Sequence, residues 1–467
     1  MPSWPDKVGL PGTQNPVHHA ALFPISETSP VQFRPPLPDL CDTVVIGGGV
    51  IGVMTAWHLA KAGQTVVLCE KGRIAGEQSS RNWGWVRQQG RDPAELPIAM
   101  EANRIWQGLA KECGEDLGFR QTGVLYLANK AGDMAGFENW LQFAKAHQLD
   151  TKLLSKAEVS AMLPSARADW PGGMITPSDG RAEPWIAVPS LARHTVRLGA
   201  TIIEDCAVRT LDMAGGRIAG VVTEHGRIAC DQVVLAGGAW SSLFLRRHGI
   251  EIPQLSVRAT VAATEPLPEI FAGQAADNHF AFRRRADGGY SLALGAFHEL
   301  YLGPDAFRRL PKYIPQLKQN PFGTSYKPLA PHCYPDAWFT RRNWADHEVS
   351  PFELMRILIP SPNQWAVRQM QEKFAAAFPN VGTPKIKLAW AGMIDSMPDI
   401  VPVVDHVPHA PGLIVATGMS GHGFGIGPAF GRIIADLVLG KPTGHDMSRF
   451  RFSRFSDGSK IELGPSL

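Results

Sequence analysis

The chain has 467 residues, of which 44% are hydrophobic and 19% are charged, and its net charge is +3. That length is enough for two or three joined domains with large cores. The weak net charge, with no dense basic run beyond Arg283–Arg285, gives no support to a nucleic-acid partner. No stretch reaches the roughly 18 apolar residues that a membrane span requires, so we expect no transmembrane segment.

The N-terminal arm, residues 1–38, is Pro-rich and aperiodic. It lacks the basic region followed by an apolar region that defines a signal peptide, and we expect a cytoplasmic protein. The arm is either disordered or wrapped over the body, with Trp4, Phe23 and Phe33 as groups that could dock part of it. The six cysteines have no C-x-x-C spacing, so we expect reduced, buried thiols, and we expect no metal site.

Residues 41–71 have the pattern of a strand, a glycine-rich loop, a helix and a second strand. The apolar run 44–46 is typical of a short, buried parallel strand. A helix is expected over 51–62, because Gly63 ends the apolar pattern, and a second strand over 66–68. Between the first strand and the helix, three glycines have the G-x-G-x-x-G spacing: Gly47, Gly49 and Gly52.

Each glycine of this loop has a structural role that a larger residue would not fill. Gly47 makes the tight turn, Gly49 lets the backbone approach a pyrophosphate, and Gly52 lets the helix pack close to the strand. The helix N-terminus directs its N–H groups at the phosphates, and Glu70 can accept hydrogen bonds from a ribose hydroxyl group. The unit predicts a dinucleotide site whose contacts are Gly47, Gly49, Val50, Ile51, Gly52, Glu70 and Lys71.

The rest of the chain alternates between helical and strand patterns. Helices are expected at 94–113, 131–148, 155–162, 189–198, 304–318 and 363–378. Strands are expected at 123–128, 201–204, 233–236, 257–263 and 291–295, with a β-meander at 208–211, 218–223 and 227–230. Arg283–Arg285 leads into a hairpin turn and is expected to face solvent. The segment 411–440 predicts a last strand, a second glycine-rich loop and a closing helix that begins near Pro428.

Several motifs occur in the order that is typical of one known family. They are the glycines at 47–52, the SSRNWGWVR run at 79–87, the strand end VVLAGGAWS and the C-terminal ATGMSGHGFGIGPAFG. In these motifs the chain resembles the D-amino-acid-oxidase-like family of FAD enzymes, over about residues 40–445. Within that family it looks most like the bacterial L-amino acid oxidases.

The resemblance implies that the dinucleotide is FAD, with the loop Gly421–Gly427 beside the flavin ring. The N-terminus of the following helix can stabilise negative charge on the flavin; the alternative is that the glycines serve tight packing alone. The resemblance adds these residues to the expected FAD contacts: Ser79, Ser80, Arg81, Asn82, Trp83, Val208, Gly237, Trp240, Gly392, Gly421, His422, Gly423, Phe424 and Gly425.

Two positions depart from the sarcosine-oxidase members of that family. Gly425 stands where they carry a lysine that touches the substrate and promotes the reaction with O2. Gly392 stands at the position nearest to their flavin-linked cysteine, and no histidine near 79–87 replaces it. We therefore expect FAD to be bound without a covalent bond.

The order of the motifs predicts an α/β fold in which two domains are interleaved along the chain. A Rossmann-type FAD-binding domain of the GR2 type is expected from 39–118, 186–255 and 386–440. A discontinuous α+β substrate domain on a mixed or antiparallel sheet is expected from 119–185 and 256–385, with a tail at 441–467. One sheet should then contain the strands at 44–46, 233–236 and 413–416.

Oxidising an amino acid requires few side chains, because the flavin accepts the hydride from Cα. A bidentate guanidinium group is the best holder of the α-carboxylate, and the resemblance places Arg87 at such a position, with Arg91 close by. His422 is either a base or a hydrogen-bonding group that transfers no proton, and we favour the second role. Asp395 and Asp399 either meet the substrate ammonium group or, preferably, serve turns. The candidate catalytic residues are Arg87, Arg91, Trp390 and His422.

Aromatic residues near both glycine loops, such as Trp83, Trp240 and Trp390, predict a roomy apolar pocket, with core packing as the alternative for each. We therefore expect oxidation of free L-amino acids with sizeable side chains, with O2 as acceptor, to the imine and 2-oxo acid, ammonia and H2O2. One alternative is a dehydrogenase of D-amino acids or N-substituted amino acids that reduces a quinone or a partner protein; another is an inactive scaffold. The region 320–345 is a candidate lid or subunit contact, and thus a candidate contact of a homo-oligomer.

Overall fold

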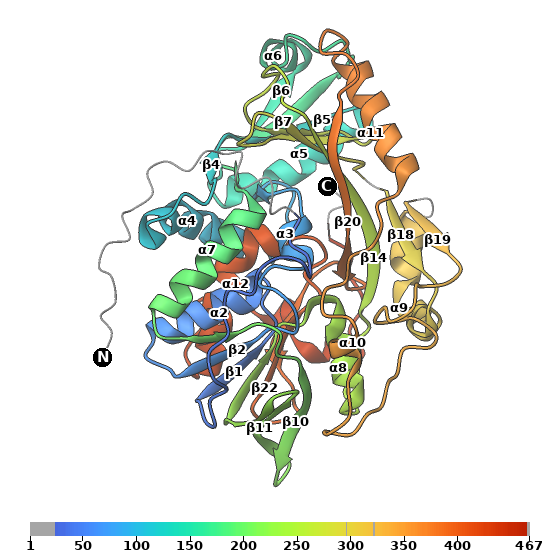
Figure 1. Ribbon diagram of the computed structural model, residues 1–467. Helices are drawn as coiled ribbons and strands as arrows, with labels where there is room; N and C mark the ends of the chain where they lie inside the picture. Colours follow the sequence, from blue (N-terminus) through green and yellow to red (C-terminus); the bar gives the residue numbers. More distant parts are fainter. Residues whose placement is uncertain (1–23, 296, 321–322, 465–467) are drawn as a thin grey trace.

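The computed structural model describes residues 24–464, except 296, 321 and 322. A six-stranded sheet occupies the lower part of the molecule in Figure 1, in the order β21-β22-β13-β1-β2-β9. Its strands are β1 (Thr43–Ile46), β2 (Val66–Cys69), β9 (Thr201–Ile203), β13 (Gln232–Leu235), β21 (Val403–His406) and β22 (Leu413–Thr417). Neighbours are parallel except β21 with β22. The prediction that 44–46, 233–236 and 413–416 share one sheet is confirmed.

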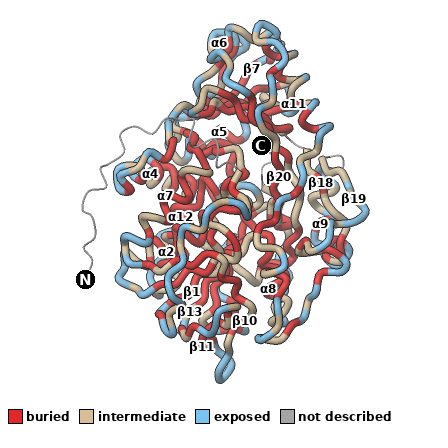
Figure 2. Tube along the Cα trace, in the orientation of Figure 1, coloured by how far each residue is buried: buried red, intermediate tan, exposed pale blue. Residues whose placement is uncertain are grey.

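Both faces of this sheet are covered, which explains its continuous apolar strands. The helices on one face are α2 (Val50–Lys61), α4 (Leu96–Cys113), α7 (Pro184–Arg197) and α12 (Gly423–Val438). The predicted meander covers the other face as β10 (Val208–Ala214), β11 (Arg217–Thr223) and β12 (Gly226–Ala229). Val45 and Val234 pack under the helices, whereas Val44 and Val233 pack against the meander. Figure 2 shows the resulting buried centre between the layers.

Two helices begin at earlier residues than the sequence predicted. The helix expected at 189–198 begins at Pro184, so that Pro189 lies inside α7 and is buried. The closing helix begins at Gly423, and Pro428 is a buried interior residue of α12. The preference of proline for a first turn still holds for α7, which begins with Pro184, whereas α12 has its proline in the interior. A Cβ on Gly427 would lie 2.8 Å from Val50 Cγ2, which shows how closely α12 lies on α2.

A second, mixed sheet forms the upper part of the molecule, in the order β19-β18-β14-β17-β16-β15-β5-β7-β6, with β20 paired to β14. Its strands are β5 (Val124–Leu127), β6 (Lys152–Ser155), β7 (Gly172–Thr176), β14 (Leu255–Thr264), β15 (Gln274–Ala276), β16 (Ala281–Arg284), β17 (Tyr290–Ala293), β18 (His298–Tyr301), β19 (Thr324–Lys327) and β20 (Ile386–Ser396). β20 pairs with β14 over its whole length, although the sequence division grouped 386–396 with the FAD-binding strands. The division into two domains stays a prediction.

The other helices and a third, small sheet complete the fold. The remaining helices are α3 (Gln78–Arg81), α5 (Ala131–Ala146), α6 (Lys156–Met162), α8 (Ser241–Arg247), α9 (Pro304–Gln319), α10 (Pro351–Leu354) and α11 (Gln364–Ala377). A small sheet contains β3 (Trp85–Val86), β4 (Arg120–Gln121) and β8 (Gly180–Arg181). Within residues 24–464, apart from the three omitted positions, no helix is long and apolar enough to cross a bilayer.

The expectation that Arg283–Arg285 faces solvent is wrong. The hairpin of β16 and β17 is present, but Arg283 is fully buried and donates to both carboxylate oxygens of Glu183, at 2.9 and 3.0 Å. Arg285 is also buried and pairs with Asp287. Glu183 is buried at the start of α7, so its charge requires a partner. Arg283 of the second sheet supplies it, which ties the two sheets together.

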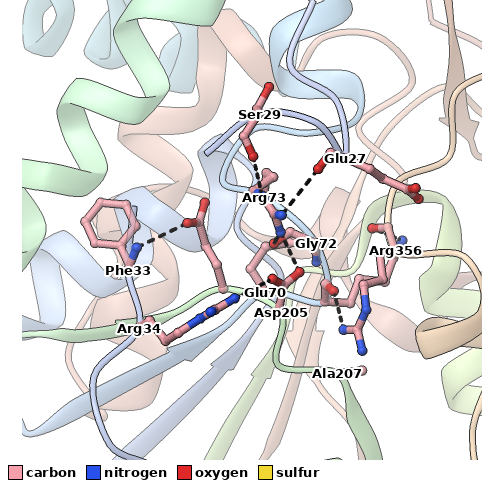
Figure 3. Close-up of polar contacts among 12 residues, drawn as sticks. Glu27, Ser29, Phe33, Arg34, Glu70, Gly72, Arg73, Asp205, Ala207 and Arg356 are labelled. Carbon is pink, nitrogen blue, oxygen red and sulfur yellow. Dashed lines mark hydrogen bonds and ion pairs between the residues drawn. The ribbon is translucent and has the colours of Figure 1, made fainter. Parts of the chain in front are cut away.

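The described part of the N-terminal arm is docked on the body. Arg73 donates to the carbonyls of Ser29 (2.9 Å) and Glu27 (3.4 Å), and it pairs with Asp205 (Figure 3). Phe33 N–H donates to Glu204, at 3.2 Å. The wrapped alternative therefore holds for residues 24–38, while Trp4 and Phe23 lie outside the described residues. The expected reduced, buried thiols are also confirmed. All six cysteines are free of disulfide bonds, and all are buried except the half-buried Cys333.

Candidate active site and cofactor cavity

A cavity of about 790 Å³ runs between the two sheets and brings both glycine-rich loops together. The first loop lines one end, and the second loop lies more than 370 residues later in the chain. The predicted residues that line the cavity are Gly47, Gly49, Val50, Ile51, Glu70, Lys71, Ser79, Arg81, Asn82, Trp83, Arg87, Arg91, Val208, Gly237, Trp240, Gly392, Gly421, His422, Gly423 and Phe424. Segments far apart in sequence thus form one continuous site.

Four predicted contact residues lie behind the cavity wall. A Cβ on Gly52 would lie 2.0 Å from Gly47 O, so this glycine serves the close packing of α2. Ser80 is fully buried outside the lining. Gly425 packs against β3, because a Cβ there would lie 3.1 Å from Trp85 O. Trp390 donates its indole N–H to Arg81 O at 3.0 Å and lies outside the lining, so its expected catalytic role stays a prediction.

The first loop is a tight cradle at the start of α2, and Gly47 is the position that requires glycine most strictly. Gly47 has φ +111°, and a Cβ there would lie 2.4 Å from Ala236 O. Gly49 caps α2, and a Cβ on it would lie 3.1 Å from Ser79 Oγ. Ser79 Oγ accepts from Val50 N–H at 2.9 Å and keeps its own proton to donate. Backbone and hydroxyl groups at a helix N-terminus are suited to a phosphate.

Glu70 closes this end of the cavity. Its Oε2 accepts from Gly48 N–H at 2.6 Å, and its Oε1 accepts from Gly72 N–H at 2.7 Å. Burial raises the pKa of Glu70 to about 7, although both hydrogen bonds and Lys71 act in the opposite direction. Each carboxylate oxygen retains a lone pair, so the group can still accept from a hydroxyl group in the cavity.

The second loop is held from two sides. Asp395, in β20, accepts from Gly418 N–H at 2.7 Å and from Met419 N–H at 3.3 Å. Burial raises the pKa of Asp395 to about 6, while these hydrogen bonds lower it. Trp106 of α4 donates its indole N–H to Gly425 O at 3.0 Å. Asp395 thus has the preferred loop-holding role, although it lies in a strand, and Asp399 instead pairs with Arg454, at 2.8 Å.

The segment 87–91 is held in place by Asp179, which the sequence did not reveal. Asp179 is fully buried, and it accepts from the backbone N–H of Gln88 at 2.7 Å and of Gln89 at 3.1 Å. Burial raises its pKa to about 6, against the pull of these hydrogen bonds. A single acid that lies 90 and 91 residues from its two partners forms no recognisable sequence motif. These bonds fix the backbone between Arg87 and Arg91, which both line the cavity.

Arg87 and Arg91 form the cationic wall of the site. Arg87 donates to Gln89 O at 2.5 Å and lies 5.6 Å from the centre of the Tyr126 ring. Arg91 is only 3% exposed, and its Nη1 has no hydrogen-bond partner among the described residues. Burial, followed by repulsion from Arg87, lowers the pKa of Arg91 to about 9, so it stays cationic at neutral pH. A buried cation without an ion-pair partner is suited to an anionic ligand.

His422 faces this wall and contacts an acid that the sequence did not indicate. Its Nδ1 lies 3.0 Å from Oε2 of Glu95, which is fully buried at the start of α4. Burial, and then the charge of Arg91, lowers the pKa of His422 to about 4. Burial opposes ionisation of Glu95, but His422 and the two arginines outweigh it and lower its pKa. The pair is therefore a neutral imidazole beside a carboxylate.

Comparison with known proteins agrees with this geometry. Residues 42–437 match the model of the FAD dependent oxidoreductase family. The chain is 31% identical over 243 residues to mitochondrial sarcosine dehydrogenase of Mus musculus, covering 50% of this chain and 26% of the relative. It is 24% identical to glycine oxidase of Bacillus subtilis, over 88% of this chain and 97% of that one. The chain thus spans about a quarter of the length of the first of these relatives.

Among solved structures, L-amino acid deaminase from Proteus myxofaciens in complex with anthranilate superimposes with a TM-score of 0.87. It shares 30% sequence identity, over 92% of this chain and 97% of that one. The fold and the family model define a flavin-dependent oxidoreductase. The chain belongs to the FAD dependent oxidoreductase family, and FAD is its cofactor.

The residues present fit FAD. The glycines at 47–49 let the loop pack tightly against Ala236, Ile74 and Ser79, and they line the cavity with backbone that is suited to a pyrophosphate. Glu70 lines the same cavity, where its carboxylate is suited to accept from a ribose hydroxyl group, and the lining also includes the loop at 421–424. These residues would hold the cofactor along its length, from the first loop to the second. The expectation of non-covalent attachment stays a prediction.

Proposed function

We propose that this enzyme oxidises free L-amino acids with sizeable apolar side chains to the 2-oxo acid and ammonia. The observation that carries the proposal is the buried guanidinium of Arg91 beside Arg87, because its Nη1 has no hydrogen-bond partner among the described residues and both arginines line the cavity that also contains the second glycine loop. Two convergent guanidinium groups match a planar carboxylate better than a lysine does. The fold likeness to an L-amino acid deaminase supports the same substrate class.

The shape of the cavity supports a large side chain. Between β14, β18 and α9 its walls are mostly apolar, and they include Val257, Ala259, Leu294, Phe297, Leu300 and Leu310. An apolar side chain that fills this part displaces water and gains roughly 25 cal/mol for each Å² buried. FAD, when bound, supplies the acceptor for the hydride that leaves Cα. Arg87 and Arg91 hold the carboxylate, and the apolar wall orients the side chain and excludes water.

The second candidate is oxidation of N-methyl amino acids. It is favoured by the likeness to sarcosine dehydrogenase. Against it stands Gly425, which occupies the position of the lysine in sarcosine-oxidase relatives and lies outside the cavity lining. An electron acceptor other than O2 is compatible with either substrate class, so the acceptor is measured separately from the substrate.

The test is anaerobic bleaching of the flavin in the purified holoenzyme. The panel contains L-leucine, L-phenylalanine, their D enantiomers, sarcosine and N-methyl-L-leucine. We expect rapid bleaching by the two L-amino acids. Bleaching by D-amino acids alone, or by N-methyl substrates alone, would contradict the proposal. H2O2 measured in air with the best substrate then distinguishes an oxidase from a dehydrogenase.

A further inference from the structure

We propose that His422 and Glu95 form a proton-accepting pair, in which His422 Nε2 takes a proton from the substrate ammonium group. Glu95 acts as the positioning residue. This inference rests on the proposed amino acid oxidation and deepens it. An amino acid binds mostly as a zwitterion at neutral pH, yet a hydride leaves Cα readily only when the neighbouring nitrogen has a free lone pair. The site therefore requires a group that removes one proton.

The contact with Glu95 sets the tautomer of His422. A carboxylate only accepts hydrogen bonds, so the imidazole nitrogen that faces it must carry the proton. That nitrogen is Nδ1, 3.0 Å from Glu95 Oε2. Nε2 then carries the lone pair. The ring is neutral because burial keeps the pKa of His422 at about 4.

Nε2 is available to a ligand. No residue in the described part of the chain makes a hydrogen bond with this atom, and 19% of the His422 side chain is exposed. The ring lines the cavity together with Arg87 and Arg91. A carboxylate held by the arginines brings its α-ammonium group to the same end of the cavity. The lone pair and the ammonium group are thus brought together by the carboxylate contact.

The charges around His422 make its proton affinity depend on the ligand. They are Arg87 and Arg91 from the segment after β3 and Glu95 from the start of α4, while Asp395 of β20 is bonded to the loop backbone. Both arginines lower the pKa of His422. A substrate carboxylate neutralises them in part and so raises that pKa. The histidine becomes a better base when the substrate is in place.

The step balances within these groups. One N–H bond of the ammonium group breaks, its electron pair stays on nitrogen, and the proton forms an N–H bond at Nε2. The imidazolium that results is stabilised by the Glu95 carboxylate, which stays charged throughout. Glu95 Oε1 is buried without a hydrogen-bond partner in the described chain. The negative charge of Glu95 is therefore free to stabilise the positive charge that forms on the adjacent imidazole ring.

The first experiment compares pH profiles of anaerobic flavin reduction for the holoenzyme and His422→Asn. General acid–base groups contribute about 10²–10⁴-fold, so we expect a loss of at least about 10²-fold at pH 7. In the variant, kcat/KM should rise about tenfold per pH unit up to the pKa of the amine, because only free amine reacts. The wild-type profile should be flat over that range. Parallel profiles would overturn the proposal.

Glu95 is tested with matched variants on the same helix. Glu95→Gln should steepen the pH profile as His422→Asn does, whereas Glu95→Asp, which keeps the charge, should recover part of the wild-type profile. The control is Glu101→Gln, since Glu101 of α4 also contacts a histidine, His445, at 2.5 Å, but lies outside the cavity lining. The control should keep the wild-type profile and FAD content. A Glu95→Gln profile equal to the control would contradict the positioning role.

A binding measurement is independent of turnover. 3-Phenylpropanoate, which has a carboxylate but no amine, is titrated calorimetrically into holoenzyme at pH 5–6 in buffers of different ionisation enthalpy. We expect proton uptake on binding to the wild type and none in His422→Asn. Equal uptake in both would overturn the proposal. If no amino acid bleaches the flavin at any pH, both the proposed function and the proton-accepting pair are wrong. If amino acids bleach the flavin but the wild type and His422→Asn have parallel pH profiles, only the proton-accepting pair is wrong.

Discussion

The two ends of the cavity are built in opposite ways. At the cofactor end, one carboxylate and two backbone amides satisfy one another, with Glu70 bonded to Gly48 and Gly72 at 2.6 and 2.7 Å. At the substrate end, Arg91 Nη1 and Glu95 Oε1 are buried without hydrogen-bond partners within residues 24–464. Each such atom costs about 1–3 kcal/mol. The cofactor end therefore keeps its shape by itself, whereas the substrate end retains buried polar atoms whose hydrogen bonds are not completed within these residues.

The largest expected effect concerns the attachment of FAD, because the cofactor is either released completely by acid or retained completely by a covalent bond. Gly392 lines the cavity at the position of the attachment cysteine of the sarcosine-oxidase relatives. A glycine offers no nucleophile, so the cofactor end should hold FAD by non-covalent contacts alone. Acid precipitation of the holoenzyme should leave all the yellow colour in the supernatant. A yellow pellet would show a covalent link and would contradict the prediction that the cofactor end holds FAD by non-covalent contacts alone.

Removing both arginines tests the substrate end most directly. Arg87→Ala with Arg91→Ala deletes two charged hydrogen bonds to the substrate carboxylate, worth about 3–6 kcal/mol together in kcat/KM. FAD content should stay unchanged, because neither residue belongs to the cradle. Steady-state kinetics and the absorbance of bound flavin measure the two effects.

The control for the arginine pair is Arg120→Ala. Arg120 is exposed and pairs with Asp116 at 2.9 Å, outside the cavity lining. A surface ion pair of this kind contributes about 0–1 kcal/mol to stability, and its loss should leave kcat/KM unchanged. Full activity in the Arg87, Arg91 double variant would show that the carboxylate is held elsewhere.

The difference between the two ends also explains what the sequence could predict. The cofactor end comes from one stretch, 41–71, where spacing and burial pattern act over a few residues. Its strands, helix and acid are all found where expected. At the substrate end, Arg87 and Arg91 were found through resemblance. Their supports could not be found, because Asp179 reaches the segment from 90 residues away and Glu95 reaches His422 from 327 away.

The errors of the sequence interpretation have one physical origin. Pro428 and Arg283 were each interpreted by a local rule: proline starts helices, and charge faces water. In the structure, Pro428 is buried inside α12, and the buried carboxylate of Glu183 draws Arg283 into the interior. Tertiary contacts between distant segments outweighed local preference at each position. Contacts between segments that are far apart in the chain cannot be recognised from the residues near any one of these positions.

Glu70→Ala should weaken the cofactor end by a smaller amount. The variant removes the acceptor for a ribose hydroxyl group, a charged hydrogen bond worth about 1.5–3 kcal/mol. The dissociation constant of FAD should rise accordingly, by roughly 10- to 150-fold, as measured by quenching of FAD fluorescence. At saturating FAD, kcat/KM should equal that of the wild type. Unchanged FAD affinity would place Glu70 away from the ribose.

The smallest effect is a pH dependence of FAD binding. Burial raises the pKa of Glu70 from its usual 4.5 to about 7 in the cofactor-free protein. The folded protein thus holds this proton more tightly than the unfolded chain, so the group's contribution to stability is lost as pH rises from 4.5 to about 7. A ribose hydroxyl group that donates to the anion lowers the pKa again, and FAD binding then releases a proton.

FAD affinity should consequently rise with pH between about 6 and 8, by less than the tenfold per pH unit that full release of one proton would give. The matched variant is Glu70→Gln, which keeps the size of the side chain but does not titrate, so its FAD affinity should be flat over the same range. Fluorescence titrations of both proteins at constant ionic strength measure the slopes. Equal slopes in the two proteins would assign the titration to another group and leave Glu70 as a backbone brace without a ribose contact. A slope in the wild type alone would show that the cofactor end, though satisfied without ligand, changes its protonation when FAD binds.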